Sequence, residues 1–176
     1  LISFILLLAG FGYKISSAPF HYWVPDVYQG APAPVTAFFA VAPKLAGFAL
    51  LIRFLYTTMA QLNLSTLAIE SIYVDWNLIL AVLSAFTMTI GNILAIRQED
   101  VKRVLAYSSI SHAGFIMMGF AVISFEAVSH MLFYMVIYSF MTLGAFGVLI
   151  ALQNKYSIKS IDEWNGVGYV HPMICA

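Results

Sequence analysis

The chain has 176 residues, of which 62% are hydrophobic and only 9% are charged. Soluble domains carry about 25% charged residues, so this composition excludes an ordinary soluble protein and indicates an integral membrane protein. The formal net charge is zero, which predicts no nucleic-acid partner, and the single cysteine, Cys175, excludes an internal disulfide and a cysteine-built zinc or iron–sulfur site.

Hydropathy and the positions of the prolines predict an all-α, polytopic transmembrane helix bundle of about five spans. A helix over 1–17 ends at the segment SSAPF, and a half-helix over 19–29 follows it. Together the two pieces, 1–29, are expected to cross the membrane once as a helix broken near Pro19. Four further spans are predicted, over 34–57, 75–96, 104–124 and 127–152.

The tail over 153–176 turns polar and is expected to lie on the membrane surface, with a short amphipathic helix over 157–168. It would lead to a next helix that the chain does not complete. The sequence also opens on Leu1 inside an apolar run, with no basic segment typical of a signal peptide. We therefore expect a fragment, a processed piece or a product started from an unusual codon.

Basic residues gather at one predicted face of the bundle, which predicts that this face is cytoplasmic or faces a matrix. The residues at this face are Arg97, Lys102, Arg103, Lys155 and Lys159. The opposite face carries Glu70, Asp75 and Glu126, with Arg53 near the end of its span as an anchor.

Three titratable side chains fall near the middle of predicted spans. Lys44 lies about ten residues into its span, which corresponds to a depth of about 15 Å, and Lys14 and His112 are expected at a similar level. Because a charge in hydrocarbon costs several kcal/mol, an intramembrane lysine is a candidate functional residue.

Lys14 lies beside the predicted helix break at Ser16, Ser17 and Pro19, where backbone groups lose their helical partners. Burial disfavours a charged amine, so a lysine here would be able to bind and release a proton. The alternative is a structural ion pair.

Lys44 follows Pro43, which removes one helical hydrogen bond and exposes the carbonyl four residues earlier. That carbonyl is expected to solvate the ammonium group. The alternative is that the side chain extends harmlessly to the membrane surface.

His112 lies in the segment YSSISHAGF with Ser108, Ser109 and Ser111, whose hydroxyls could order water for proton transfer. A packed, hydrogen-bonded histidine is the equal alternative.

His21 and Asp26 lie in the half-helix near the basic face. They could form a point at which protons enter, although a helix cap is the favoured interpretation for them.

Two long segments resemble a known family. FGYKISSAPFHYWVPDVYQGAPAPVTAFFAVAPKLAGFALLIR and GNILAIRQEDVKRVLAYSSISHAGFIMMGF are similar to the antiporter-like subunits of respiratory complex I. The run PDVYQGAPAP favours subunit 2, called subunit N in bacteria, over its two larger paralogues, and the similarity extends to the tail SIDEWNGVGYVHP.

The resemblance implies a fold of fourteen helices built around two inverted five-helix repeats, each with one broken helix. This chain would supply about the seventh to eleventh helices. Lys14 would be the central lysine beside the broken seventh helix, Lys44 the relay lysine of the eighth helix, and His112 a polar channel residue of the tenth.

The family pairs its central lysine with a glutamate of the fifth helix, and its twelfth helix carries another charged residue; neither helix is present. A partner polypeptide would then supply the missing helices and the carboxylate partner of Lys14. Respiratory genes that are split into pieces, and proteins rich in Phe, Tyr and Ile, are typical of organellar genomes. We therefore expect the mitochondrial inner membrane, with a bacterial plasma membrane as the alternative. Other membrane-arm subunits and lipids are the expected partners.

The resemblance implies a proton-translocating subunit of NADH:ubiquinone oxidoreductase. Approach of the carboxylate would load Lys14 with a proton, and separation would release it towards Lys44 and His112. Apart from structural lipid, the chain itself would bind no cofactor, since NADH, flavin, iron–sulfur clusters and ubiquinone belong to other subunits. A subunit of a multisubunit cation/proton antiporter and an inert membrane scaffold are the alternatives.

Overall fold

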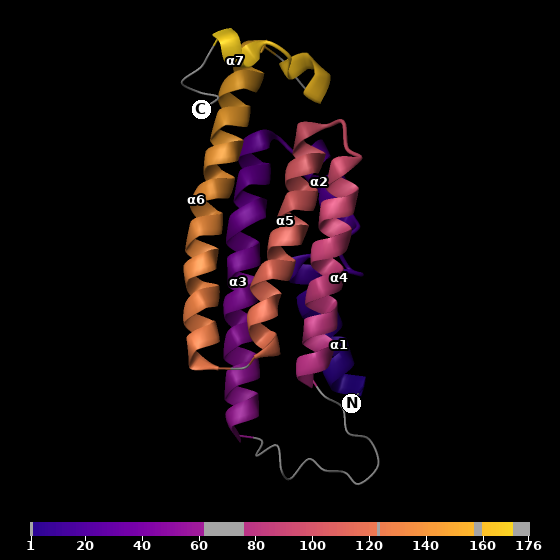
Figure 1. Cartoon of the computed structure of the whole chain (residues 1–176), viewed down its shortest axis with the longest axis vertical. Helices are drawn as coiled ribbons and strands as arrows, with labels where there is room; N and C mark the ends of the chain where they lie inside the picture. The colour runs from indigo at the N-terminus through magenta and orange to yellow at the C-terminus, as the bar shows by residue number, and fades with distance from the viewer. Residues whose placement is uncertain (1, 62–75, 123, 157–159, 171–176) are drawn as a thin grey trace.

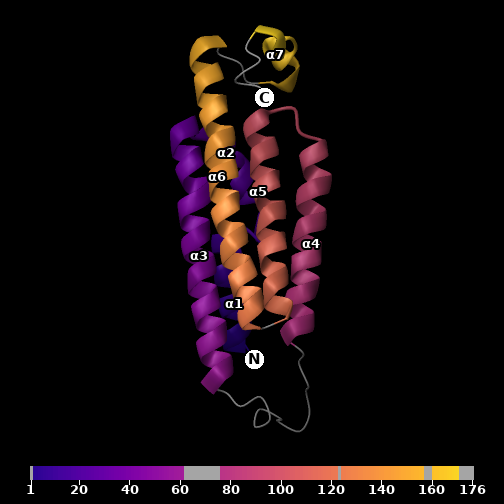
Figure 2. The same cartoon turned by 60° about the vertical axis from the view of Figure 1, so that its left-hand side comes forward.

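The chain forms a bundle of helices whose axes run roughly side by side (Figures 1 and 2). A computed structural model describes residues 2–61, 76–122, 124–156 and 160–170. Its α-helices are α1 (Ile2–Ile15), α2 (Trp23–Gly30), α3 (Ala33–Gln61), α4 (Trp76–Ile96), α5 (Val101–Met117), α6 (Phe125–Tyr156) and α7 (Val167–Val170), with 3₁₀ turns η1 (Met118–Ala121) and η2 (Ile161–Trp164).

Four of these helices are long and apolar enough to span a membrane, and α1 adds a shorter apolar helix over Ile5–Ile15. The four candidate spans are Ala33–Thr57, Asn77–Ile96, Val101–Ala121 and Phe125–Tyr156. The predicted all-α transmembrane bundle, with its first span broken near Pro19, is therefore confirmed: α1 ends at Ile15 and α2 begins at Trp23.

Two elements differ from the sequence prediction. Helix α3 runs through Pro43, as the predicted span over 34–57 required, but it extends to Gln61, and Pro43 does not break it. A proline inside a helix costs one hydrogen bond but need not end the helix. The tail forms η2 and α7 in place of one amphipathic helix over 157–168, and Gly166 lies between them with φ of 86°. That left-handed conformation suits glycine and interrupts a helix. Residues 157–159 lie outside the described part of the chain.

One end of the bundle carries the basic connection between α4 and α5, and we call it the basic end. Asp100 begins α5 by accepting hydrogen bonds from the backbone N–H groups of Lys102 and Arg103. The C-terminal elements lie at this same end (Figures 1 and 2) and join it through the bond from the Ile161 N–H to the Glu99 carbonyl. Of the charges used to predict the topology, Lys159, Glu70 and Asp75 lie outside the described residues.

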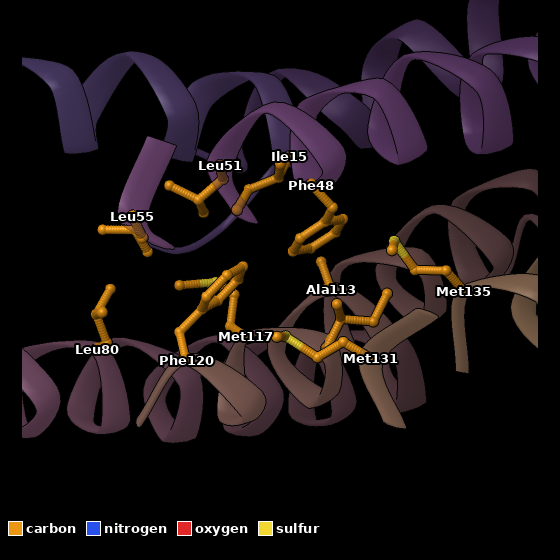
Figure 3. Close-up of a cluster of buried hydrophobic side chains, with 11 residues drawn as sticks. Ile15, Phe48, Leu51, Leu55, Leu80, Ala113, Met117, Phe120, Met131 and Met135 are labelled. Atoms are coloured by element: carbon orange, nitrogen blue, oxygen red, sulfur yellow. The ribbon is translucent and has the colours of Figure 1, made fainter. Parts of the chain in front are cut away.

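Two apolar clusters fill the bundle. The basic-end cluster consists of Val24, Tyr28, Ala33, Ala37, Ala40, Val41, Ala106, Ile110, Phe146 and Leu149. The distal cluster, drawn in Figure 3, consists of Ile15, Phe48, Leu51, Leu55, Leu80, Ala113, Ile116, Met117, Phe120, Met131 and Met135. Lys44 lies between the two clusters along α3, since Val41 belongs to one and Phe48 to the other.

Helices α4 and α5 approach most closely where glycine faces backbone. A Cβ atom at Gly91 would lie 2.7 Å from the Ser111 nitrogen, and one at Gly114 would lie 2.8 Å from the Met88 nitrogen. Ser84 donates a hydrogen bond to the Gly114 carbonyl at 2.8 Å across the same contact. These contacts fix the rotation of α5, and therefore decide which of its polar residues face the centre of the bundle.

Candidate functional site

The helix break is a compact turn inside the bundle. Its first residue, Ser16, is fully buried and has φ of 66°, a left-handed conformation that ends the helix. The chain then folds back, so that the Ser17 N–H bonds the Gly12 carbonyl at 2.9 Å. Gly12 is closely packed against the turn, because a Cβ there would lie 2.8 Å from the Phe20 ring. The predicted break residues Ser16, Ser17 and Pro19 thus form the break.

The side chain of Thr87 in α4 is a hydrogen-bond partner for the backbone of the break. Sequence analysis missed this residue. Its buried hydroxyl accepts a hydrogen bond from the Ala18 N–H at 3.1 Å and donates one to the Leu83 carbonyl at 2.6 Å. An N–H group released from a helix at membrane depth needs such a partner. Thr87 therefore ties the broken helix to α4.

Replacing Thr87 with valine keeps the shape of the side chain but leaves the Ala18 N–H without its partner. We expect a loss of about 1–3 kcal/mol, the typical cost of an unsatisfied buried donor. The melting temperature of the detergent-solubilised protein measures this loss. Thr89→Val is the matched control, because the exposed Thr89 hydroxyl bonds only within its own helix. Equal melting temperatures for the two variants would contradict this role for Thr87.

Lys44 lies buried in a polar layer between the two apolar clusters, with an exposed fraction of 3%. Its ammonium donates to the Ser109 hydroxyl at 2.7 Å and to the Ser109 carbonyl at 3.2 Å. The predicted acceptor, the carbonyl released by Pro43 on the same helix, is therefore replaced by acceptors on α5. Within the described residues no carboxylate forms an ion pair with Lys44.

Two buried tyrosines complete this layer, and sequence analysis missed both. The Tyr28 hydroxyl lies 3.5 Å from the Ser109 hydroxyl oxygen. Tyr138 of α6 donates to the Ala40 carbonyl at 3.2 Å and lines the space around the Lys44 side chain. Their exposed fractions, 1% and 3%, match that of Lys44.

His112 is half-buried among aromatic side chains, and its Nδ1 lies 2.7 Å from the Tyr134 hydroxyl. Its ring also contacts Tyr138, with centroids 5.4 Å apart. The three predicted serines separate: Ser109 bonds Lys44, Ser111 faces Gly91 of α4, and Ser108 is half-buried. A single water-ordering cluster of Ser108, Ser109 and Ser111 is therefore not formed.

The side chain of Lys14 is exposed on the surface of the described chain. Its stem crosses Gly47 of α3, where a Cβ atom would lie 3.2 Å from the Lys14 Cγ. Gly47 follows Lys44 by three residues, as His112 follows Ser109, and α3 and α5 both run away from the basic end (Figure 1). Lys14 and His112 thus lie at a similar level, about 4.5 Å beyond Lys44 along the bundle.

The two residues proposed for proton entry or capping, His21 and Asp26, have different surroundings. Asp26 pairs with Arg103 at 2.7 Å on the basic end, and its side chain is 75% exposed. His21 is half-buried, and its Nδ1 has no hydrogen-bond partner among the described residues. Helix α2 has Tyr22 at its N-cap and no side-chain capping bond. The capping interpretation is therefore wrong, because Asp26 lies inside the helix and faces α5.

A family model described as "NADH:quinone oxidoreductase/Mrp antiporter, TM" matches residues 1–176. The chain belongs to this family. The resemblance inferred from the sequence is thereby confirmed.

Relatives of the chain include bacterial proteins named as quinone oxidoreductase subunits. NADH-quinone oxidoreductase subunit N 2 of Sorangium cellulosum is 47% identical over 97% of this chain and 33% of the relative. Subunit N of Chlorobium chlorochromatii is 43% identical over 98% of this chain and 33% of the relative. The chain spans about a third of the length of the curated relatives it matches.

Solved structures share the fold. A chain of respiratory complex I from Thermus thermophilus aligns with a TM-score of 0.71 and 33% identity over 96% of this chain and 34% of that chain. The Mrp complex of Dietzia aligns with a TM-score of 0.78 but 19% identity, over 90% of this chain and 28% of that chain, and shows the fold alone.

Proposed function

We propose that this chain forms core helices of subunit N, also called subunit 2, of an NADH:quinone oxidoreductase, and that it carries protons within the membrane. Lys14, Lys44 and His112 are the proposed proton-carrying residues. The family membership and the named relatives support the enzyme, and the arrangement of these residues supports their role.

The observation that carries the proposal is the environment of Lys44. A buried ammonium without a carboxylate is costly, and serine oxygens offset only part of the lost hydration. If the residue at this position had only a structural role, an apolar side chain would give a more stable fold. A lysine that alternates between its charged and neutral forms explains why an amine lies there.

The proposed partners are the other membrane-arm subunits, surrounding lipid, and a segment that supplies a carboxylate to Lys14. The exposed side chain of Lys14 has no carboxylate partner within the described residues, which agrees with a partner outside them. NADH, flavin, iron–sulfur clusters and quinone are assigned to other subunits. Because the named relatives are bacterial, we favour a bacterial plasma membrane over the mitochondrial inner membrane.

A multisubunit cation/proton antiporter is the second candidate, since the Mrp complex shares the fold. The names of the relatives with higher sequence identity favour the oxidoreductase.

The test is the composition and activity of the native membrane complex that contains this chain. We expect the purified complex to catalyse NADH-dependent quinone reduction. It should also contain a polypeptide segment that supplies a membrane carboxylate. Sodium-dependent proton flux in a complex without NADH oxidation would favour the antiporter and overturn the proposal.

A further inference from the structure

The surroundings of Lys44 and of His112 share one side chain. The space around the Lys44 side chain is lined by Ser109, by Tyr138 and by the apolar residues Leu45, Phe48, Ala113 and Ile116. The His112 ring is surrounded by Phe115, Tyr134 and Tyr138. Tyr138 of α6 is the residue common to both sets.

Among the polar groups around Lys44, Tyr138 is the one that can pass a proton on to His112. The Ser109 hydroxyl already donates to the Ala106 carbonyl at 2.7 Å while it accepts from Lys44 at 2.7 Å. The Tyr138 hydroxyl lies near Ser109 and bonds the Ala40 carbonyl, which is in the helical turn before Lys44. A phenol can accept one proton and give up another, whereas the apolar lining residues cannot.

We propose that Tyr138 is a relay residue that passes protons between Lys44 and His112, and that its hydrogen bond to the Ala40 carbonyl interrupts this relay in the conformation observed. The inference rests on the proposed function. In the transfer the Lys44 ammonium gives its proton to the Tyr138 hydroxyl oxygen, and the original phenol proton passes to Nε2 of His112. Lys44 becomes a neutral amine, His112 becomes an imidazolium, and the phenol stays neutral.

Tyr134 has a supporting role in this relay. Transfer to Nε2 requires the tautomer in which Nδ1 carries the hydrogen and donates it to the Tyr134 hydroxyl, 2.7 Å away. Tyr134 is therefore a positioning residue, because in this tautomer its hydroxyl accepts the Nδ1 hydrogen and holds the ring with Nε2 free to accept a proton.

The experiment uses the complete complex in membrane vesicles and measures NADH-driven proton translocation in H₂O and in D₂O. Tyr138→Phe is expected to lower the rate of translocation by about 100-fold or more, within the range that a positioned proton-transfer group contributes. It should also raise the solvent isotope effect, because proton transfer then limits the rate. Tyr134→Phe should raise the isotope effect in the same way.

Tyr56→Phe is the matched control, because it removes a comparable tyrosine-to-carbonyl bond, to Ser124 at 2.7 Å, far from Lys44. Equal losses in Tyr138→Phe and Tyr56→Phe, without a change in isotope effect, would overturn the relay in favour of packing. Normal translocation in Tyr138→Phe together with its loss in Lys44→Met would overturn the relay and leave the proposed function intact. Normal translocation in both would overturn the two together. If Tyr138→Phe does not assemble, a wild-type rate and isotope effect in Tyr134→Phe overturns the relay.

Discussion

Replacing Lys14 with alanine is expected to abolish proton translocation by this subunit while the complex still assembles. The side chain is exposed and packs only its stem across Gly47, so its removal leaves no buried cavity. What the variant loses is the amine beside the helix break that we propose to carry protons. The ratio of protons translocated to electrons transferred, measured in sealed vesicles, checks this result.

Two further variants distinguish the loss of a proton-carrying amine from the loss of a positive charge and from the loss of side-chain packing. Lys14→Arg keeps the positive charge but cannot release its proton, and we expect the same loss as with alanine. Arg53→Ala removes another exposed cation, on α3, and should leave the ratio unchanged. A normal proton-to-electron ratio in Lys14→Ala would remove Lys14 from the mechanism.

Replacing Lys44 with methionine should also lower the rate of translocation, by about 100-fold or more, without weakening the fold. Methionine has a similar volume, and replacing a buried charged group by an apolar one is often neutral or stabilising by about 1–4 kcal/mol. The expected result is a lost proton flux with an unchanged or higher melting temperature of the solubilised protein. A residue kept for stability alone would give the opposite change in melting temperature.

Ser109→Ala provides the comparison for Lys44→Met. This variant keeps the amine but removes the hydroxyl acceptor at 2.7 Å, so that only the carbonyl at 3.2 Å remains. The expected cost is about 1–3 kcal/mol, as for other buried groups that lose a partner. A melting temperature that falls more in Lys44→Met than in Ser109→Ala would show that the amine stabilises the bundle.

Hydropathy and the positions of the prolines were sufficient to predict the spans and the break. A membrane fixes the length of a spanning helix and requires every backbone N–H and C=O group to be hydrogen-bonded within the protein, which water does not. Counting residues along each predicted span also placed Lys44 and His112 at similar depths in the membrane. Helical rotation could have corrected the serine prediction: Ser109 and Ser111 are 200° apart around a helix with 3.6 residues per turn, so they cannot face one neighbour.

The tyrosines and Thr87 could not be identified in this way. Aromatic residues are abundant at membrane interfaces and in packing, so nothing local distinguishes Tyr138 from Tyr56. The role of Thr87 depends on a turn of the chain 69 residues earlier, at Ala18. The exposure of Lys14 likewise depends on the direction in which α1 is turned, which depth alone does not reveal.

The apolar clusters on either side of Lys44 have an electrical consequence. In a membrane the voltage falls mainly across low-dielectric material, and moving one charge through the full potential costs about 2.3 kcal/mol per 100 mV. A proton that passes between Lys44 and His112 changes its level by only about 4.5 Å, so this step is nearly insensitive to voltage. On the proposed proton path, the work against the membrane potential would therefore be concentrated in the steps that carry the proton past the basic-end cluster and the distal cluster.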